Sequence, residues 1–194
     1  METAQTKSSR AKEVLSIPNI MGYFRIALVP LYLILFFRAM DGHAYWPIYV
    51  VIVVSGLTDF FDGKIARKYN MVTDLGKMLD PIADKITIGA IIISLAFKYK
   101  VVIPMIAVYL VKEAYMAIMG MIQLRRGIKI EGAMWYGKAC TFLTYIVLLA
   151  LLIFQNLPHN VVLGLVGFDI ALMLFTLVMY FFYHAKLFKE KNNA

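Results

Sequence analysis

Six long apolar segments, joined by short polar connections, constrain the fold of this chain more than any other feature. Most of them approach the ~20 residues that a helix needs to cross the hydrocarbon core of a bilayer. Because that core offers no water to backbone polar groups, helices are the only plausible form for such segments. The segments comprise residues 18–37, 46–61, 78–97, 101–124, 134–154 and 161–183. We therefore expect an all-α integral membrane protein with six transmembrane helices.

The composition excludes an ordinary soluble domain. Hydrophobic residues make up 61% of the 194 residues, and the mean hydropathy is +0.73. Charged residues make up only 16%, against about 25% in soluble domains. The net charge of +8 is carried between the apolar segments, so nucleic acid is not an expected partner. The single cysteine, Cys140, excludes an intrachain disulfide and offers no cysteine-based metal site.

The first 17 residues are polar and basic, and they lack the apolar stretch of a signal peptide. Residues 11–17 could form a short helix on the cytoplasmic membrane surface that ends at Pro18, or equally well a frayed tail. We expect a cytoplasmic N-terminal segment (1–17), a six-helix domain (18–185) and a cytoplasmic tail (186–194).

Basic residues in the connections predict the orientation in the membrane. One side collects Lys7, Arg10, Lys12, Lys64, Arg67, Lys68, Lys77, Arg125, Arg126, Lys129, Lys186, Lys189 and Lys191, whereas the other has Arg38, Lys98 and Lys100. Since basic connections stay on the cytoplasmic side, we expect both termini to face the cytoplasm, with the protein in the inner (plasma) membrane of a bacterial cell.

Four carboxylates lie where the second apolar segment ends and the third begins. Asp59 and Asp62 are three residues apart, and Asp80 and Asp84 are four apart, so each pair shares one face of a helix. Charge at the edge of a bilayer is costly and is kept for function unless it is neutralised. Two helix ends with two carboxylates each offer hard oxygen ligands for Mg²⁺ or Mn²⁺. The pattern predicts a metal-dependent active site on the cytoplasmic side.

The spacing around these carboxylates is specific. The chain reads Asp59-x-x-Asp62-Gly63-x-x-Ala66-Arg67 and, after eight further residues, Gly76-x-x-x-Asp80-x-x-x-Asp84. This pattern resembles the complete signature of the CDP-alcohol phosphotransferase family, and the six apolar segments are similar to that family's six-helix layout.

The resemblance implies transfer of a substituted phosphoryl group from a CDP-linked lipid to an alcohol, with release of CMP. It implies two Mg²⁺ or Mn²⁺ ions held by Asp59, Asp62 and Asp80. Asp84 would be the general base that takes the acceptor's proton, and it could also contact a metal. Two divalent ions could clamp the anionic pyrophosphate and offset the charge on the departing phosphate.

Nucleotide binding is implied for Asp62, Gly63, Arg67, Gly76 and Asn19. The two glycines would let the nucleotide approach the backbone, although glycines in such helices also serve packing. The planar Arg67 side chain suits a phosphate.

The first apolar segment also resembles the family pattern. Pro18-Asn19-Ile20, Arg25 and Pro30 fit it, whereas Gly22 stands where relatives usually carry Thr. Asn19 could hydrogen-bond either the pyrophosphate or a neighbouring helix.

Acceptor binding is predicted for three basic residues, Lys112, Arg126 and Lys138. Lys112 and Glu113 fall within the fourth apolar segment, where unpaired charge is expensive. Because adjacent helical residues do not face each other, we expect them to have different partners. Arg126 could instead serve only topology, whereas Lys138 lies inside the start of a span and could bind a phosphate.

Similarity to one branch of the family suggests the acceptor. Leu79–Lys85 resembles phosphatidylglycerophosphate synthases and CDP-lipid-dependent cardiolipin synthases, but Gly120 and Cys140 stand where that branch has a second Arg and a second Lys. We expect CDP-diacylglycerol as donor and glycerol-3-phosphate as acceptor. Cardiolipin synthesis from phosphatidylglycerol is the alternative, followed by inositol phosphate or another polar alcohol.

Two further expectations concern partners. The resemblance implies a homodimer among membrane lipids, with a lateral groove for the lipid donor. A divalent-cation transporter is the alternative of a different class, but its carboxylates would be expected near the bilayer midplane.

Overall fold

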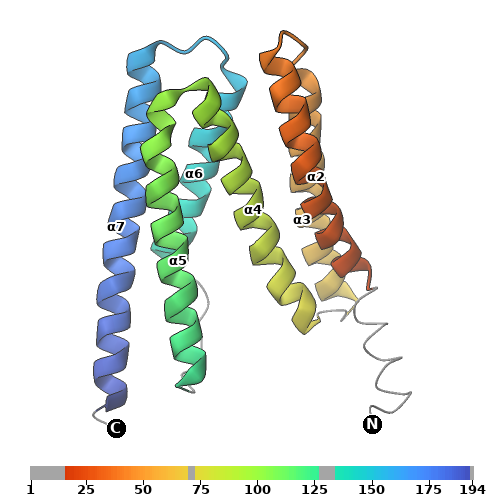
Figure 1. Cartoon of the computed structure of the whole chain (residues 1–194). Coiled ribbons are helices and arrows are strands. Elements are labelled where there is room, and N and C mark those ends of the chain that lie inside the picture. The colour runs from red at the N-terminus through yellow and green to blue at the C-terminus, as the bar shows by residue number, and fades with distance from the viewer. Residues whose placement is uncertain (1–15, 70–72, 127–133, 193–194) are drawn as a thin grey trace. The chain divides into compact units, whose positions relative to one another are not determined.

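The computed structural model of the chain describes residues 16–69, 73–126 and 134–192, and every regular element within them is helical (Figure 1). The elements are α2 (Ile17–Met40), α3 (Trp46–Lys68), α4 (Asp74–Lys98), the short 3-10 helix η1 (Lys100–Val102), α5 (Ile103–Arg125), α6 (Trp135–Ile153) and α7 (His159–Asn192). The predicted all-α class is confirmed for the described residues, and each apolar segment forms one long helix. Residues 1–15 lie outside the described residues, and with them most of the segment expected to form an interfacial helix.

Four of these helices are long and apolar enough to cross a membrane. The candidate spans are Asn19–Met40, Lys100–Arg125, Trp135–Ile153 and His159–Lys189. Helices α3 and α4 are not among them. Both include charged residues of the signature, which lower their mean hydropathy, so six spans remain a prediction.

Several helix boundaries differ from the apolar segments. Helix α3 continues to Lys68, as expected for a helix that carries Asp59 and Asp62 past its apolar part. Helix α4 begins at Asp74, a few residues before the third apolar segment, and has Pro81 inside it rather than in the first turn, where proline is best tolerated. Helix α7 runs to Asn192, which makes most of segment 186–194 helical.

The chain divides into two compact units, Met1–Ser94 and Leu95–Ala194. In the first, α2 packs along α3, and the Tyr32 hydroxyl lies 2.7 Å from Ser94 Oγ of α4. Gly42 forms the turn after α2 with φ 97°, a left-handed conformation that glycine adopts at little cost. In the second unit, α7 packs against α5 and α6.

The burial pattern suits a lipid environment. Large apolar side chains such as Val53, Leu110 and Phe182 are more than half exposed, whereas polar residues such as Thr144 and Asp169 are fully enclosed. Charged and polar groups inside spans usually face the bundle interior. The fold therefore supports a membrane protein with polar interiors.

Candidate active site

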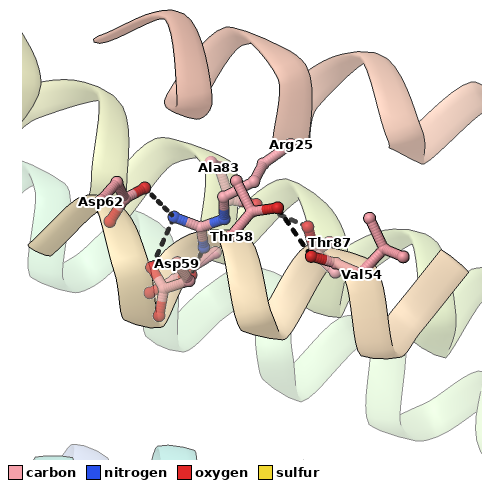
Figure 2. A network of polar contacts seen from close by, with 8 residues as sticks. Arg25, Val54, Thr58, Asp59, Asp62, Ala83 and Thr87 are labelled. Carbon is pink, nitrogen blue, oxygen red and sulfur yellow. Dashed lines mark hydrogen bonds and ion pairs between the residues drawn. The ribbon is translucent and has the colours of Figure 1, made fainter. Parts of the chain in front are cut away.

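Three helices of the first unit bring the signature carboxylates to one place. Asp59 and Asp62 lie on α3, and Asp80 and Asp84 lie on α4. They are joined by Arg25 of α2, whose guanidinium points between α3 and α4 (Figure 2). Residues up to 59 positions apart in the chain thus meet around one cation.

The contacts of Arg25 are ionic. Its Nη1 lies 2.5 Å from Asp59 Oδ1 and 3.9 Å from Asp62 Oδ2. Its Nη2 donates a hydrogen bond to Asp84 Oδ1. Arg25 is only 3% exposed, so the attraction acts in a partly desolvated setting, where it is stronger than in water.

Two threonines lie beside the carboxylates on the same helices: Thr58 directly precedes Asp59 on α3, and Thr87 follows Asp84 by one turn on α4. Thr58 Oγ1 donates to the Val54 carbonyl at 2.7 Å, and Thr87 Oγ1 donates to the Ala83 carbonyl at 2.8 Å (Figure 2). These bonds satisfy the hydroxyls within their own helices. The carboxylates therefore face Arg25 without competition from these hydroxyls.

Asp62 is the most enclosed carboxylate of the group. Its side chain is 4% exposed, against 47% for Asp59 and 41% for Asp84. Asp62 lies just past the apolar segment 46–61. Burial first, and then repulsion by Asp80 and Asp59, raise its pKa to about 6 despite the attraction of Arg25. The ionised form would thus gain from additional positive charge.

The donor set fits divalent cations by its chemistry. It consists of four carboxylates against one guanidinium, and Asp62 Oδ2 is buried with no hydrogen-bond partner in the part of the chain that the structure describes. Such all-oxygen sets suit Mg²⁺ or Mn²⁺. Within the described residues, however, no three His, Cys, Asp or Glu side chains stand close enough to hold a metal ion. The Arg25 guanidinium lies among the carboxylates.

Asn19 and Gly76 also meet in this unit. Thr73 Oγ1 donates to Asn19 Oδ1 at 2.9 Å and accepts from the Gly76 amide at 2.9 Å. A Cβ on Gly76 would lie 2.7 Å from Asn19 Oδ1 and 3.1 Å from Thr73 Oγ1. Of the two roles predicted for Asn19, the contact with a neighbouring helix terminus is present.

Sequence reasoning missed Thr73. Its bond to the amide three residues on, immediately before α4, is a typical N-cap contact. The signal available in the sequence was a threonine three residues before Gly76 of the signature. This cap lets α4 begin early, which explains why Pro81 lies inside the helix.

The structure describes the other two residues predicted to contact the nucleotide, Gly63 and Arg67, to different extents. Gly63 is half-buried on α3, one residue after Asp62. The backbone of Arg67 belongs to α3, but its side chain lies outside the described residues, as does that of Ala66. Their predicted contacts with a nucleotide remain predictions.

The predicted acceptor residues belong to the second unit. Lys112 on α5 is 8% exposed, and its Nζ lies 2.5 Å from Glu113 Oε1. The expectation that these neighbours have different partners is therefore wrong, because their long side chains bend together where little water is available. Arg126 is exposed and lies 4.8 Å above the Phe188 ring, and Lys138 is exposed on α6.

Sequence reasoning also missed Asp169 on α7. Thr144 Oγ1 of α6 donates to its Oδ1 at 2.8 Å, and Lys112 exerts an electrostatic attraction on it. Its Oδ2 is buried with no hydrogen bond within the described residues. A lone Asp inside the last apolar segment was the signal, since charge within a span is costly. We call Lys112, Glu113, Thr144 and Asp169 the α5–α7 polar cluster.

Comparison with known proteins places the chain in a family. The family model described as CDP-alcohol phosphatidyltransferase matches residues 15–183. A cardiolipin synthase (CMP-forming) of Streptomyces coelicolor is 37% identical over 132 residues, which cover 66% of this chain and 61% of that protein.

Two other relatives carry related names. A CDP-diacylglycerol–glycerol-3-phosphate 3-phosphatidyltransferase of Rickettsia bellii is 48% identical over 83 residues, 43% of this chain and 45% of that protein. A probable phosphatidylglycerophosphate synthase of Mycobacterium tuberculosis is 32% identical over 143 residues, 73% of this chain and 66% of that protein. The chain thus spans about half to two thirds of the length of the curated relatives it matches. With the family model covering most of its length, this chain belongs to the CDP-alcohol phosphatidyltransferase family.

Proposed function

We propose that this chain transfers the phosphatidyl group of CDP-diacylglycerol to glycerol-3-phosphate, with a divalent-metal requirement and release of CMP. The observation that carries the proposal is the convergence of Asp59, Asp62 and Asp84 on one buried cation, Arg25. A site that gathers carboxylates from two helices in this way is suited to holding cations. The names of the Rickettsia and Mycobacterium relatives support the donor and the product.

The reaction forms one bond and breaks another at the lipid-side phosphorus. The acceptor hydroxyl oxygen attacks this phosphorus, and the bond to the bridging pyrophosphate oxygen breaks. CMP leaves with the electron pair. Asp84 takes the hydroxyl proton as general base and passes it to water.

In this proposal Asp59, Asp62 and Asp80 hold two Mg²⁺ or Mn²⁺ ions, which Asp84 can also contact. When bound, the ions supply positive charge that offsets the charge developing on the departing phosphate. The buried Oδ2 of Asp62, which has no hydrogen bond to any described residue, supports its place among the ligands. Asp62, Gly63, Arg67, Gly76 and Asn19 surround the nucleotide.

We further propose that α3 and α4 cross the membrane with the other helices, giving six spans with the aspartates at the cytoplasmic face of the inner membrane. Exposed apolar residues along α3, such as Val50 and Val53, support contact with lipid. The bias of basic residues supports the orientation. The lipid donor then enters laterally, and the protein works as a homodimer.

One observation favours cardiolipin synthesis as a second candidate function. Lys112, predicted to bind the acceptor phosphate, is already paired with Glu113. With Asp169, the α5–α7 polar cluster carries one positive and two negative formal charges. Such a cluster suits acceptor hydroxyls better than a phosphate, as in the glycerol headgroup of phosphatidylglycerol. The name of the Streptomyces relative agrees with this alternative.

An acceptor assay tests the proposal. The purified protein in detergent receives CDP-diacylglycerol, Mg²⁺ or Mn²⁺, and in separate reactions glycerol-3-phosphate, phosphatidylglycerol, inositol phosphate or no acceptor. We expect CMP release with glycerol-3-phosphate and a phosphatidylglycerophosphate product by mass spectrometry. No CMP above the control without acceptor would refute this acceptor, and release with phosphatidylglycerol alone would establish the second candidate. Metal uptake into proteoliposomes without CDP-lipid chemistry would instead indicate a transporter.

A further inference from the structure

Thr73 contacts two residues that the proposed function places around the nucleotide. Its hydroxyl accepts a hydrogen bond from the Gly76 amide at 2.9 Å and donates one to Asn19 Oδ1 at 2.9 Å. Thr73 is not a fixed position of the signature and lies directly before α4. One side chain therefore links the start of α4 to Asn19 of α2, which lies 54 positions earlier in the chain.

The Gly76 amide determines the direction of both hydrogen bonds. A backbone N–H can only donate, so the Thr73 oxygen must be the acceptor in the bond to Gly76. The hydroxyl hydrogen of Thr73 then serves the second bond, in which Asn19 must present its carbonyl oxygen rather than its NH2 group. The NH2 group of Asn19 consequently points away from Thr73. The orientation of the Asn19 amide thus follows from two linked hydrogen bonds that begin at the Gly76 N–H.

The space above Gly76 shows how closely the three residues pack. A Cβ on Gly76 would lie 2.7 Å from Asn19 Oδ1 and 3.1 Å from Thr73 Oγ1, so any side chain there would push Asn19 aside. Asn19 is only 1% exposed, which leaves its side chain little room to move. The absence of a side chain at Gly76 therefore allows the Asn19 amide to reach Thr73, and the enclosed setting holds it there.

We propose that Thr73 is a positioning residue for the nucleotide, and that it holds the Asn19 amide with its NH2 group toward the CDP part of the donor. This inference rests on the proposed function, which places Asn19 and Gly76 at the nucleotide. An NH2 group donates hydrogen bonds to the phosphate and ribose oxygens of CDP, whereas a carbonyl oxygen in the same place would repel the phosphate oxygens. Thr73 touches neither the nucleotide nor a reacting atom and acts through Asn19.

Kinetics with both substrates test the positioning role. CMP release is measured at varied CDP-diacylglycerol and at varied acceptor concentrations for the wild type, Thr73→Val and Thr73→Ser. Thr73→Val keeps the shape of the side chain but removes the hydroxyl, so the KM for CDP-diacylglycerol should rise about tenfold, the effect of one lost hydrogen bond. The KM for the acceptor should not change, and Thr73→Ser, which keeps the hydroxyl, should resemble the wild type. An unchanged donor KM in Thr73→Val, or an equal rise in both KM values, would overturn the proposal.

Thr87→Val is the matched control. Thr87 is also half-buried and lies on α4, but among the described residues its hydroxyl bonds the Ala83 carbonyl of its own helix. Its donor KM should equal that of the wild type. A rise as large as in Thr73→Val would contradict the proposal, because loss of any hydroxyl near the start of α4 would then have the same effect.

Binding of CDP without turnover separates this inference from the proposed function. Calorimetric titration with CDP and Mg²⁺ compares the wild type, Thr73→Val, Asn19→Asp and the double variant, and thermal melts confirm that each is folded. Asn19→Asp keeps an acceptor oxygen for the Thr73 hydroxyl but loses the NH2 donor, so CDP should bind at least about tenfold more weakly. Adding Thr73→Val should then cost little more, because the group that Thr73 orients is already gone.

The outcomes of this titration are distinct. Fully additive losses in the double variant, or wild-type CDP affinity in Asn19→Asp, would refute the role of Thr73. A wild-type protein that binds CDP but releases no CMP with any acceptor would refute the proposed function, and the variants' CDP affinities would still decide the role of Thr73. A wild-type protein that binds no CDP would overturn both.

Discussion

At the residue scale, the signature aspartates differ in the exposed fraction of their side chains. Asp59 and Asp84 keep substantial contact with solvent, whereas Asp62 is enclosed. An enclosed carboxylate depends on nearby cations because water no longer compensates its charge. Asp62 should therefore be the carboxylate most sensitive to the presence of metal.

Replacing Asp62 should separate metal binding from the stability of the metal-free protein. Asp62→Asn removes a ligand charge, so CMP release should fall by more than about 100-fold, since even supporting residues cost 10–100-fold. In EDTA the same variant should melt no lower than wild type, because repulsion by Asp59 and Asp80 is relieved. Wild-type CMP release from Asp62→Asn would contradict its place among the ligands.

The stability of the metal-free protein should also depend on pH through Asp62. The pKa of Asp62 is raised from its ordinary value of 3.8 to about 6 in the folded protein, so folding takes up a proton between these values. The contribution of Asp62 to the free energy of unfolding therefore decreases as the pH rises from about 4 to about 6. Thermal melts in EDTA across this range should show a fall that Asp62→Asn reduces. An identical pH dependence in the variant would contradict the assignment.

Asp84 should behave differently from the ligands. Asp84→Asn should retain Mn²⁺ binding and donor binding but transfer the phosphatidyl group about 10²–10⁴-fold more slowly, the typical loss of a general base. Single-turnover CMP release, measured beside Mn²⁺ affinity, checks this. A defect confined to metal affinity would make Asp84 a ligand instead.

Sequence spacing identified the aspartates but not what lies between them. The three- and four-residue spacings placed each pair on one helix face, and three of the four carboxylates do converge on one cation. The role of Arg25 depends on how α2 packs against α3, which no local pattern encodes. The partner of Asp169 and one partner of Thr73 also lie on other helices, so local spacing does not encode these two contacts, whereas the Thr73 cap on Gly76 is local.

At the element scale, the close approach of α6 and α7 explains the glycine at position 137. A Cβ on Gly137 would collide with the Tyr180 hydroxyl and lie 3.0 Å from its ring. The Tyr180 hydroxyl accepts a hydrogen bond from the Met134 amide at 3.2 Å. Gly137 therefore lets Tyr180 cap the start of α6.

Adding one methyl group at Gly137 should weaken this contact. Gly137→Ala should destabilise the protein by about 1–3 kcal/mol, as overpacking usually does. Gly164→Ala on α7 is the control, because no atom of the described residues lies within 4 Å of a Cβ there, and it should be neutral or slightly stabilising. Thermal melts in detergent compare them. Equal effects of the two substitutions would contradict the close approach.

The bond between α6 and α7 at Asp169 can be tested in the same way. Thr144→Val leaves Asp169 without its hydroxyl donor and should cost about 1–3 kcal/mol. Thr176→Val is matched, since Thr176 is equally buried but, among the described residues, its hydroxyl bonds the Leu172 carbonyl of its own helix, and it should cost less. A loss as large in Thr176→Val would show that burial alone decides the effect.

Helix existence was predictable from hydropathy, but helix ends were not. The length of each apolar segment predicted one helix, but polar residues outside the segments determine where that helix begins and ends. Thr73 moves the start of α4 to Asp74, and α7 continues beyond its apolar segment to Asn192. Such ends depend on caps and side-chain contacts rather than on hydrophobic periodicity.

At the scale of the whole molecule, charge distribution and family membership lead to one account. In the proposed arrangement of six spans, basic residues gather on one side of the membrane, and the signature aspartates lie on that same side. An enzyme that uses a soluble or headgroup acceptor needs its carboxylates at the membrane surface rather than inside it. The proposed placement favours a phosphatidyltransferase over a cation transporter, whose carboxylates would be expected near the bilayer midplane.

The account centres on divalent cations held by the signature aspartates, and counting bound metal tests that most directly. Mn²⁺ bound per chain should be measured by electron paramagnetic resonance in purified wild type and Asp62→Asn, without substrate. The account predicts two ions in the wild type and fewer, more weakly held ions in the variant. No bound Mn²⁺ in the wild type, or the same count and affinity in both proteins, would contradict it.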